Sequence, residues 1–147
     1  PVRGFTSLHI LAAGAVQTGA VGPMDSIVVA IDARREEVYV QSFGPNLSLD
    51  GTPTICSLEK AAADAPMGPG WIVGSGSALL HGHLSKLGSA LAVSWAPDQP
   101  DARVLARIAA ESEGPGGNPS EGPAALVAPV VPLYLRAPDA RIKVIPT

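Results

Sequence analysis

The sequence has one cysteine, few aromatic residues and no long hydrophobic run, and each shortage excludes a class of protein. Cys56 alone cannot form an internal disulfide. Aromatic residues make up 4% of the chain, so a core must be built mainly from Val, Ile, Leu and Ala. The longest apolar stretches, 27–31 and 124–131, fall far short of the roughly 20 residues of a membrane-spanning helix. We therefore expect no membrane segment.

Positive charge is also scarce. Ten Lys and Arg against 13 Asp and Glu give a formal net charge of -3, and the basic residues are scattered along the chain. Because proteins that hold nucleic acid by its phosphates carry a basic patch, we expect no direct tRNA binding by this chain alone. No charged, apolar and small leader precedes the first apolar segment, which predicts a cytoplasmic protein.

The residues that are present favour one packed domain. Apolar residues make up 46% and charged residues 16% of the 147 residues, a balance typical of globular proteins. We assign residues 1–147 to a single domain, with a flexible connection over 112–128 that starts in a Gly- and Pro-rich stretch. Because the chain begins at Pro1 and not at methionine, we expect a fragment of a longer protein.

Apolar spacing predicts an α/β domain, with a mixed sheet that opens on a hairpin and is flanked by helices. Strands at 27–31 and 38–43 are expected to form the antiparallel hairpin, the first of them central in the sheet. A strand at 71–73, a helix from 77 and a strand at 91–93 predict a βαβ unit. The other expected elements are a helix capped by Thr6 or Ser7, a loop over 44–54 with room for a short strand, a helix over 58–65 and a helix capped by Asp98.

Helical spacing also predicts which side chains face the core. In the helix from residue 77 these are Leu79, Leu80, His83, Leu84 and Leu87, and in the last helix Val104, Leu105, Ile108 and Ala109.

The turn between a predicted strand and helix, Gly74, Ser75, Gly76 and Ser77, is the best candidate for a ligand site. Backbone N–H groups at a helix N-terminus can hold a phosphate or the edge of a nucleotide. The turn lacks the lysine of a P-loop and the third glycine of a dinucleotide fingerprint, and Gly-x-Ser-x-Gly is not matched around its serines. The alternative is a turn whose glycines serve packing alone.

Histidine and cysteine form no pattern of metal binding or catalysis. His81 and His83 lie two positions apart on a predicted helix and point about 200° away from each other, so they do not share an ion. His9 and His81 are expected to face solvent. Cys56 has no cationic neighbour in sequence and is expected to be a small buried apolar group. We predict no metal, no cofactor and no catalytic residue.

Charged residues 34–37 form the tip of the predicted hairpin, where they are expected to be solvated; binding a partner is the alternative. Near the C-terminus, Tyr134 and Arg136 alternate with Leu133 and Leu135 in an extended segment. Since one pair should face inward, we expect the leucines to do so.

Three segments resemble the TsaB (YeaZ) family. Residues 4–12, Gly-Phe-Thr-Ser-Leu-His-Ile-Leu-Ala, resemble its helix start Gly-Val-Ser-Ser-Leu-Glu-x-Leu-Ala. Residues 30–39 are similar to its hairpin Ile-Asp-Ala-Arg-x-Gly-Glu-Val-Tyr, and residues 131–140 to its Pro-x-Tyr-Leu-Arg signature. The matched positions are Asp32, Arg34, Glu37, Tyr39, Tyr134 and Arg136. Glu36 stands where the family favours glycine, so we expect positive φ and strain there.

The resemblance implies the second domain of an actin-like (ASKHA), ribonuclease H-like protein whose N-terminal domain is absent here. It implies a non-catalytic scaffold in the synthesis of threonylcarbamoyladenosine in tRNA, and no protease in spite of the older glycoprotease name. The implied partners are a catalytic TsaD-like subunit and a TsaE-like ATPase, bound mainly through the absent domain. The alternative function is a nucleotide-binding, kinase-like ASKHA domain with its ligand at Gly74–Ser77.

A homodimer is a further expectation. In a two-domain actin-like protein the inner faces of the domains pack on each other, so one domain alone should expose apolar surface. We expect that surface on the helix from Thr6, at Leu8, Leu11, Ala12 and Val16.

Overall fold

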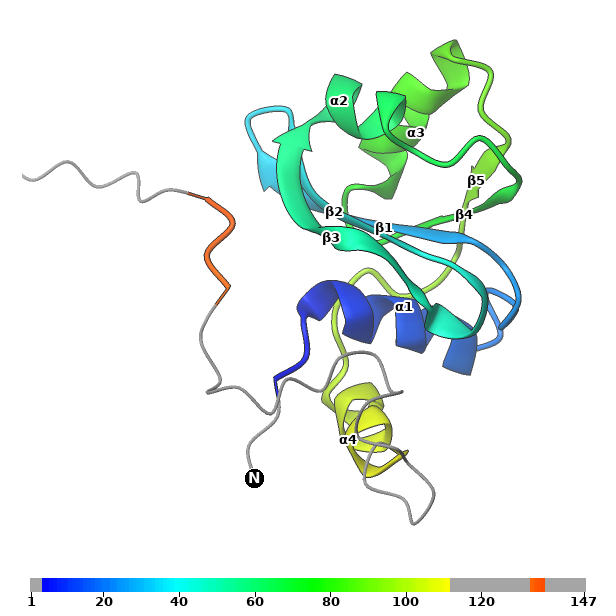
Figure 1. Ribbon diagram of the computed structural model, residues 1–147, viewed down its shortest axis with the longest axis vertical. Helices are drawn as coiled ribbons and strands as arrows, with labels where there is room; N and C mark the ends of the chain where they lie inside the picture. Colours follow the sequence, from blue (N-terminus) through cyan, green and yellow to red (C-terminus); the bar gives the residue numbers. More distant parts are fainter. Residues whose placement is uncertain (1–3, 112–132, 137–147) are drawn as a thin grey trace, which may run out of the picture.

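A computed structural model describes residues 4–111 and 133–136, which form a five-stranded mixed sheet with helices on both faces (Figure 1). The predicted α/β class is confirmed. The strand order is β3-β2-β1-β4-β5. The elements are α1 (Ser7–Gln17), β1 (Ile27–Arg34), β2 (Glu37–Phe43), the 3-10 turn η1 (Pro45–Leu47), β3 (Leu49–Ser57), α2 (Leu58–Ala63), β4 (Gly70–Val73), α3 (Ser77–Lys86), β5 (Leu91–Val93) and α4 (Ala102–Glu111).

No helix within these residues is long and apolar enough to cross a membrane. The predicted connection over 112–128 lies outside the described residues.

Strand β1 is the centre of the sheet, as its doubly apolar sequence predicted. It pairs antiparallel with β2, where Ile31 lies opposite Tyr39, and parallel with β4, where Val28 lies opposite Ile72. The alternate side chains of a strand point to opposite faces, and β1 is buried on both. The hairpin and the βαβ unit of the prediction therefore share this strand.

The helices form separate layers on the two faces (Figure 1). Helices α2 and α3 cover one face, where Leu80 and Leu84 pack against Val28 and Ile72. Helix α1 covers the other face, and α4 packs against the outer side of α1. Each face of the sheet therefore has its own apolar core.

The expectation that α1 exposes an apolar patch is wrong. Leu8, Leu11 and Ala12 are buried against the sheet. Ile10 and Ala13, on the opposite side of the helix, are buried against Val104 of α4. Because α1 is apolar around most of its circumference, it needs cover on two sides, and its own domain supplies both.

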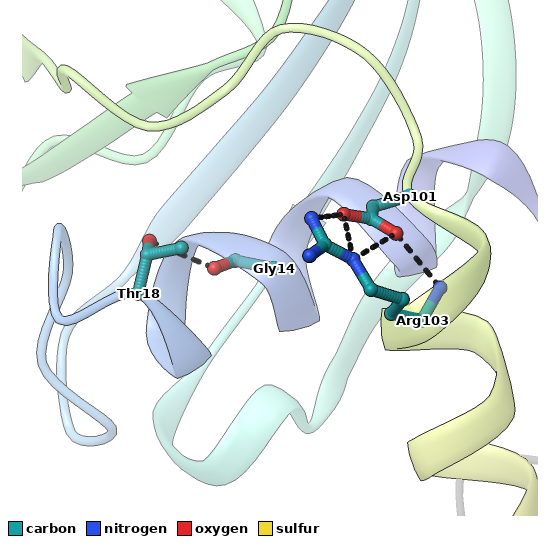
Figure 2. A network of polar contacts seen from close by, with 4 residues as sticks. All are labelled: Gly14, Thr18, Asp101 and Arg103. Carbon is teal, nitrogen blue, oxygen red and sulfur yellow. Dashed lines mark hydrogen bonds and ion pairs between the residues drawn. The ribbon is translucent and has the colours of Figure 1, made fainter.

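Asp101, and not Asp98, caps α4 (Figure 2). Its carboxylate accepts the backbone N–H of Arg103 at 2.7 Å and pairs with the Arg103 guanidinium, with Nη2 and Oδ2 2.6 Å apart. These hydrogen bonds from Arg103 lower the pKa of Asp101. Of the predicted stripe on α4, Val104 is buried and Leu105, Ile108 and Ala109 are half-buried.

At the end of α1, the hydroxyl of Thr18 donates to the carbonyl of Gly14 at 2.9 Å (Figure 2). Between α1 and the start of α4 lies a small cleft, lined in part by Leu11, Gly14, Thr18 and Asp101. Besides apolar side chains its walls carry Thr18, Gln99 and Asp101, and two of these, Thr18 and Asp101, make the end contacts of α1 and α4. The cleft therefore belongs to the packing of the two helices.

Residues 49–57 form a full edge strand where the sequence predicted a loop with a short strand. Strand β3 pairs antiparallel with β2, with Cys56 opposite Val38 and Leu49 opposite Phe43. Gly51 and Pro53 argued against a strand in the sequence, because both residues are unfavourable inside a sheet. An edge strand hydrogen-bonds to a neighbouring strand on one side only, so it tolerates them.

Helix α3 buries a narrower stripe than predicted. Leu80 and Leu84, four residues apart, are buried, whereas Leu79 and Leu87 are exposed. His83 is half-buried, with Nδ1 3.9 Å from the Glu59 carboxylate of α2. The short α2 packs against the side of α3 that carries His83, and no element of residues 4–111 covers Leu79 and Leu87.

His9 was expected to face solvent but is 7% exposed. Its ring lies near those of Phe5 and Phe43, with centroid distances of 6.0 and 5.9 Å. Burial in this apolar site lowers the pKa of His9, because the charged imidazolium is poorly solvated there.

Stability should therefore fall as the pH drops below about 6.5, the ordinary pKa of histidine in the unfolded chain. Since the folded-state pKa of His9 is lower, the unfolded chain takes up the proton first, and the stabilisation present above this pH is lost on acidification. Urea unfolding between pH 7.5 and 5 measures this slope. We expect His9→Leu to flatten it and the control His81→Gln to preserve it; equal slopes for the wild type and His9→Leu would contradict the assignment.

Candidate functional site

The predicted turn at Gly74–Ser77 lies beside the end of β1. Strands β1 and β4 are parallel, so their carboxyl ends meet at one edge of the sheet. There the N–H of Gly76 donates to the carbonyl of Ala30 at 2.9 Å, and the N–H of Asp32 donates to Ser75 Oγ at 3.2 Å. Ligands of open α/β sheets commonly bind at this edge.

Packing against β1 explains both glycines of the turn. Gly74 has φ +104, and a Cβ on it would lie 2.5 Å from the carbonyl oxygen of Ala30. A Cβ on Gly76 would lie 3.1 Å from the amide nitrogen of Asp32. Besides the Gly76 amide, the N–H of Ser77 is engaged, donating to the carbonyl of Gly74 at 3.0 Å. The backbone amides of Gly76 and Ser77 therefore already donate hydrogen bonds within the protein, and a phosphate bound at this turn could not use them.

The hairpin turn, residues 34–36, has an unusual backbone. Arg34, Arg35 and Glu36 have φ values of 66, 55 and 61, so the strain expected at Glu36 extends over the whole turn. A residue other than glycine in a sparsely populated region costs on the order of 1 kcal/mol or more. The Asp32 carboxylate accepts the N–H of Arg34 at 2.7 Å, and the Glu36 carbonyl accepts the N–H of Leu58 at 3.0 Å. These contacts offset part of the strain.

Four of the six matched positions come together around this turn. Arg34 Nη1 lies 3.5 Å from Asp32 Oδ2. Arg136 pairs with Glu37, which joins residues 99 positions apart. Of the other two, Tyr39 is half-buried against the core under α1, and Tyr134 is exposed.

The C-terminal segment differs from the expectation in one respect. Leu133 is exposed, so the prediction that both leucines face inward is wrong. Leu135 and Arg136 are half-buried. Leu135 and Arg136, although consecutive, are both partly shielded from solvent, because the ion pair to Glu37 holds Arg136 against the hairpin.

Sequence reasoning missed the role of the Leu58 amide, which supports the hairpin turn from the start of α2. No residue type signals a backbone donor, so the sequence carries no sign of it. It also missed the pair Ser85 and His81, whose spacing of four on a helix could have drawn attention to it. Ser85 Oγ lies 3.5 Å from both ring nitrogens of His81 and donates to the His81 carbonyl at 2.8 Å. With its proton engaged and the ring distant, Ser85 is not an activated nucleophile.

Cys56, expected to be a small buried apolar group, is half-buried and packs against the core under α2 and α3. Burial raises the pKa of its thiol, while the charge of Lys60 opposes the rise. A thiol that stays protonated at neutral pH is a poor nucleophile. Within the described ranges, no group of three or more His, Cys, Asp and Glu side chains could hold a metal ion.

The fold matches solved structures from Pseudomonas aeruginosa. One, described as an uncharacterized protein with similarity to peptidase YeaZ, superposes with a TM-score of 0.62 at 25% identity, over 90% of this chain and 57% of its own. The chain has a YeaZ-like fold. YeaZ itself superposes with a TM-score of 0.56 at 21% identity, over 74% of this chain and 50% of its own. The resemblance read from the sequence is thus confirmed for the fold.

Curated relatives extend the similarity to mycobacteria. Uncharacterized proteins of Mycobacterium tuberculosis and Mycobacterium bovis are 34% identical over 146 residues, which cover 96% of this chain and 52% of theirs. The chain spans about half the length of the curated relatives it matches. No protein-family model matches it.

Gly74→Ala should lower the free energy of unfolding by more than about 2 kcal/mol, because it combines strained φ with a backbone clash. Gly82→Ala is the matched control. Nothing lies within 4 Å of a Cβ at Gly82, in the middle of α3, and alanine there should stabilise the helix by about 0.5–1 kcal/mol. Urea unfolding of both variants measures these free energies. A Gly74→Ala protein as stable as the wild type would refute the packing explanation.

Proposed function

We propose that this chain is the non-catalytic part of a scaffold subunit that supports a TsaD-like catalytic subunit in making threonylcarbamoyladenosine in tRNA. The observation that carries the proposal is how the matched residues of the YeaZ-like fold are used. Asp32 pairs with Arg34 and Glu37 with Arg136 around a surface turn. Side chains that neutralise one another shape a surface and do not converge on a substrate.

The described part of the chain supports a scaffold over an enzyme. Cys56 has a raised pKa and Ser85 donates its proton to a carbonyl. One structural neighbour is described as similar to a peptidase. For this chain we propose no peptidase activity, since the Ser85 proton is donated to the His81 carbonyl and not to the His81 ring, and the Cys56 thiol has a raised pKa.

A nucleotide-binding, kinase-like domain is the second candidate. The position of Gly74–Ser77 at the carboxyl edge of β1 and β4 favours it, because this is where open α/β sheets bind ligands. The engaged amides of Gly76 and Ser77 weigh against it.

In the proposed complex, a TsaE-like ATPase joins the scaffold and the catalytic subunit, and the complex works in the cytoplasm. The net charge of -3 supports tRNA being held by another subunit. The homodimer remains a proposal, but the buried apolar side chains of α1 remove the surface first suggested for it.

Binding to a TsaD-like subunit from the same organism tests the scaffold function directly. Because the resemblance gives the main contact to the other domain, we expect a weak complex, with Kd on the order of 10 µM or above, by sedimentation. If the hairpin turn contributes, Arg34→Glu should weaken the complex several-fold. Arg103→Glu is the control, since Arg103 is also an exposed arginine paired with an aspartate, but on α4. Absence of any complex at about 100 µM would contradict the proposal.

Adding Mg-ATP separates the two candidate functions. The scaffold predicts an unchanged melting temperature, whereas a ligand at 100 times its Kd adds about 2.7 kcal/mol of stability. A rise in melting temperature that saturates with ATP and disappears in Ser75→Ala would favour the nucleotide-binding domain.

A further inference from the structure

The hairpin turn is held from three directions. The Asp32 carboxylate holds the N–H of Arg34 from within β1, and the Leu58 amide holds the carbonyl of Glu36 from the start of α2. The third contact, between Arg136 and Glu37, comes from a segment 99 residues away in sequence. The turn is therefore supported by the sheet, by a helix and by the C-terminal segment 133–136.

The third contact is the better shielded of the two ion pairs. In the pair of Arg34 with Asp32, the arginine side chain is 86% exposed, and exposed pairs contribute little. In the pair of Arg136 with Glu37, the side chains are 26% and 39% exposed, so solvent screens their charges less. A charge-assisted hydrogen bond between partly shielded partners is among the stronger polar contacts.

Glu37 is placed to transmit this contact to the turn. It is the first residue of β2 and directly follows Glu36, the last of the three left-handed residues. In the register of the hairpin Glu37 lies opposite Arg34. The pairing shifts by a bulge or similar irregularity just before this point, between Asp32 and Arg34. Fixing the Glu37 side chain therefore limits how the strained backbone can relax toward a more common turn.

We propose that Arg136 acts as a latch: by pairing with Glu37, segment 133–136 holds the hairpin turn 34–36 in its left-handed conformation. When the segment leaves, the turn relaxes. Two conformations of one surface element, biased by a contact from a distant segment, are the basis of a conformational switch. The proposal does not depend on the proposed function, because it concerns only residues of this chain.

The exposed side chains that precede Arg136 are where a binding partner would release the latch. Tyr134 is 84% exposed and Leu133 is exposed with it, two and three residues before Arg136. A protein surface that buries these two side chains would pull on the segment that carries the latch. Binding at the segment and the shape of the hairpin turn would then be linked.

Amide hydrogen exchange, followed by NMR on the complete chain, tests the latch. The reporters are the amides of Arg34 and Leu58, which hydrogen-bond at the turn. We expect Arg136→Ala and Glu37→Gln each to accelerate their exchange about three- to tenfold. The double variant should add nothing further, because both changes remove one interaction. Arg136→Lys, which keeps the charge, should restore part of the protection.

Arg103→Ala is the control, since it removes an arginine from an exposed ion pair on α4. It should leave both reporters unchanged. Unchanged exchange at Arg34 and Leu58 in Arg136→Ala would overturn the latch and leave Arg136 as a mere tether of its own segment. Equal acceleration at the buried amide of Val29 would overturn it too, because it would show a loss of global stability. Additive effects in the double variant would likewise contradict it.

Discussion

The hydrogen bond from the Gly76 amide to the Ala30 carbonyl, 2.9 Å long, is the contact on which this edge of the molecule depends. It joins the middle of the central strand, just past the last residue that pairs with β4, to the start of α3, and it forms only because Gly74 and Gly76 allow the turn to approach the β1 backbone. Beyond this contact β1 continues through Asp32 into the hairpin turn. The position of α3 against the sheet follows from it.

The same contact determines what the edge can do. The carboxyl edge of parallel strands is where α/β proteins commonly bind ligands, but here the protein's own groups occupy much of it. Ser75 accepts from the Asp32 amide, and Asp32 in turn accepts from Arg34. Polar groups that satisfy one another in this way fix a shape. These internally satisfied polar groups are the reason why we propose recognition of another protein and not chemistry on a small molecule.

Local patterns were enough to predict the hairpin and the βαβ unit, because the β-branched run at 27–31 and the glycine turn are signals within a few residues. Where tertiary packing decides, the sequence was misleading. Pro53 concealed β3, since only its edge position makes proline acceptable there. His9 was expected to face solvent, but it is buried and contacts the rings of two phenylalanines. Leu79 and Leu87 matched the apolar spacing of a helix, but in the described part of the chain no element packs over them. At the site, the sequence indicated Glu37 and Arg136 separately; only the fold pairs them.

Exchange of the Gly76 amide proton, with and without Mg-ATP, tests most directly the claim that this edge is closed by the protein itself. If the amide is committed to Ala30, it should exchange as slowly as the amides of the central strand, and ATP should leave its rate unchanged. An amide that exchanges rapidly in the free protein and becomes protected when ATP is added would show an open ligand site and contradict the account.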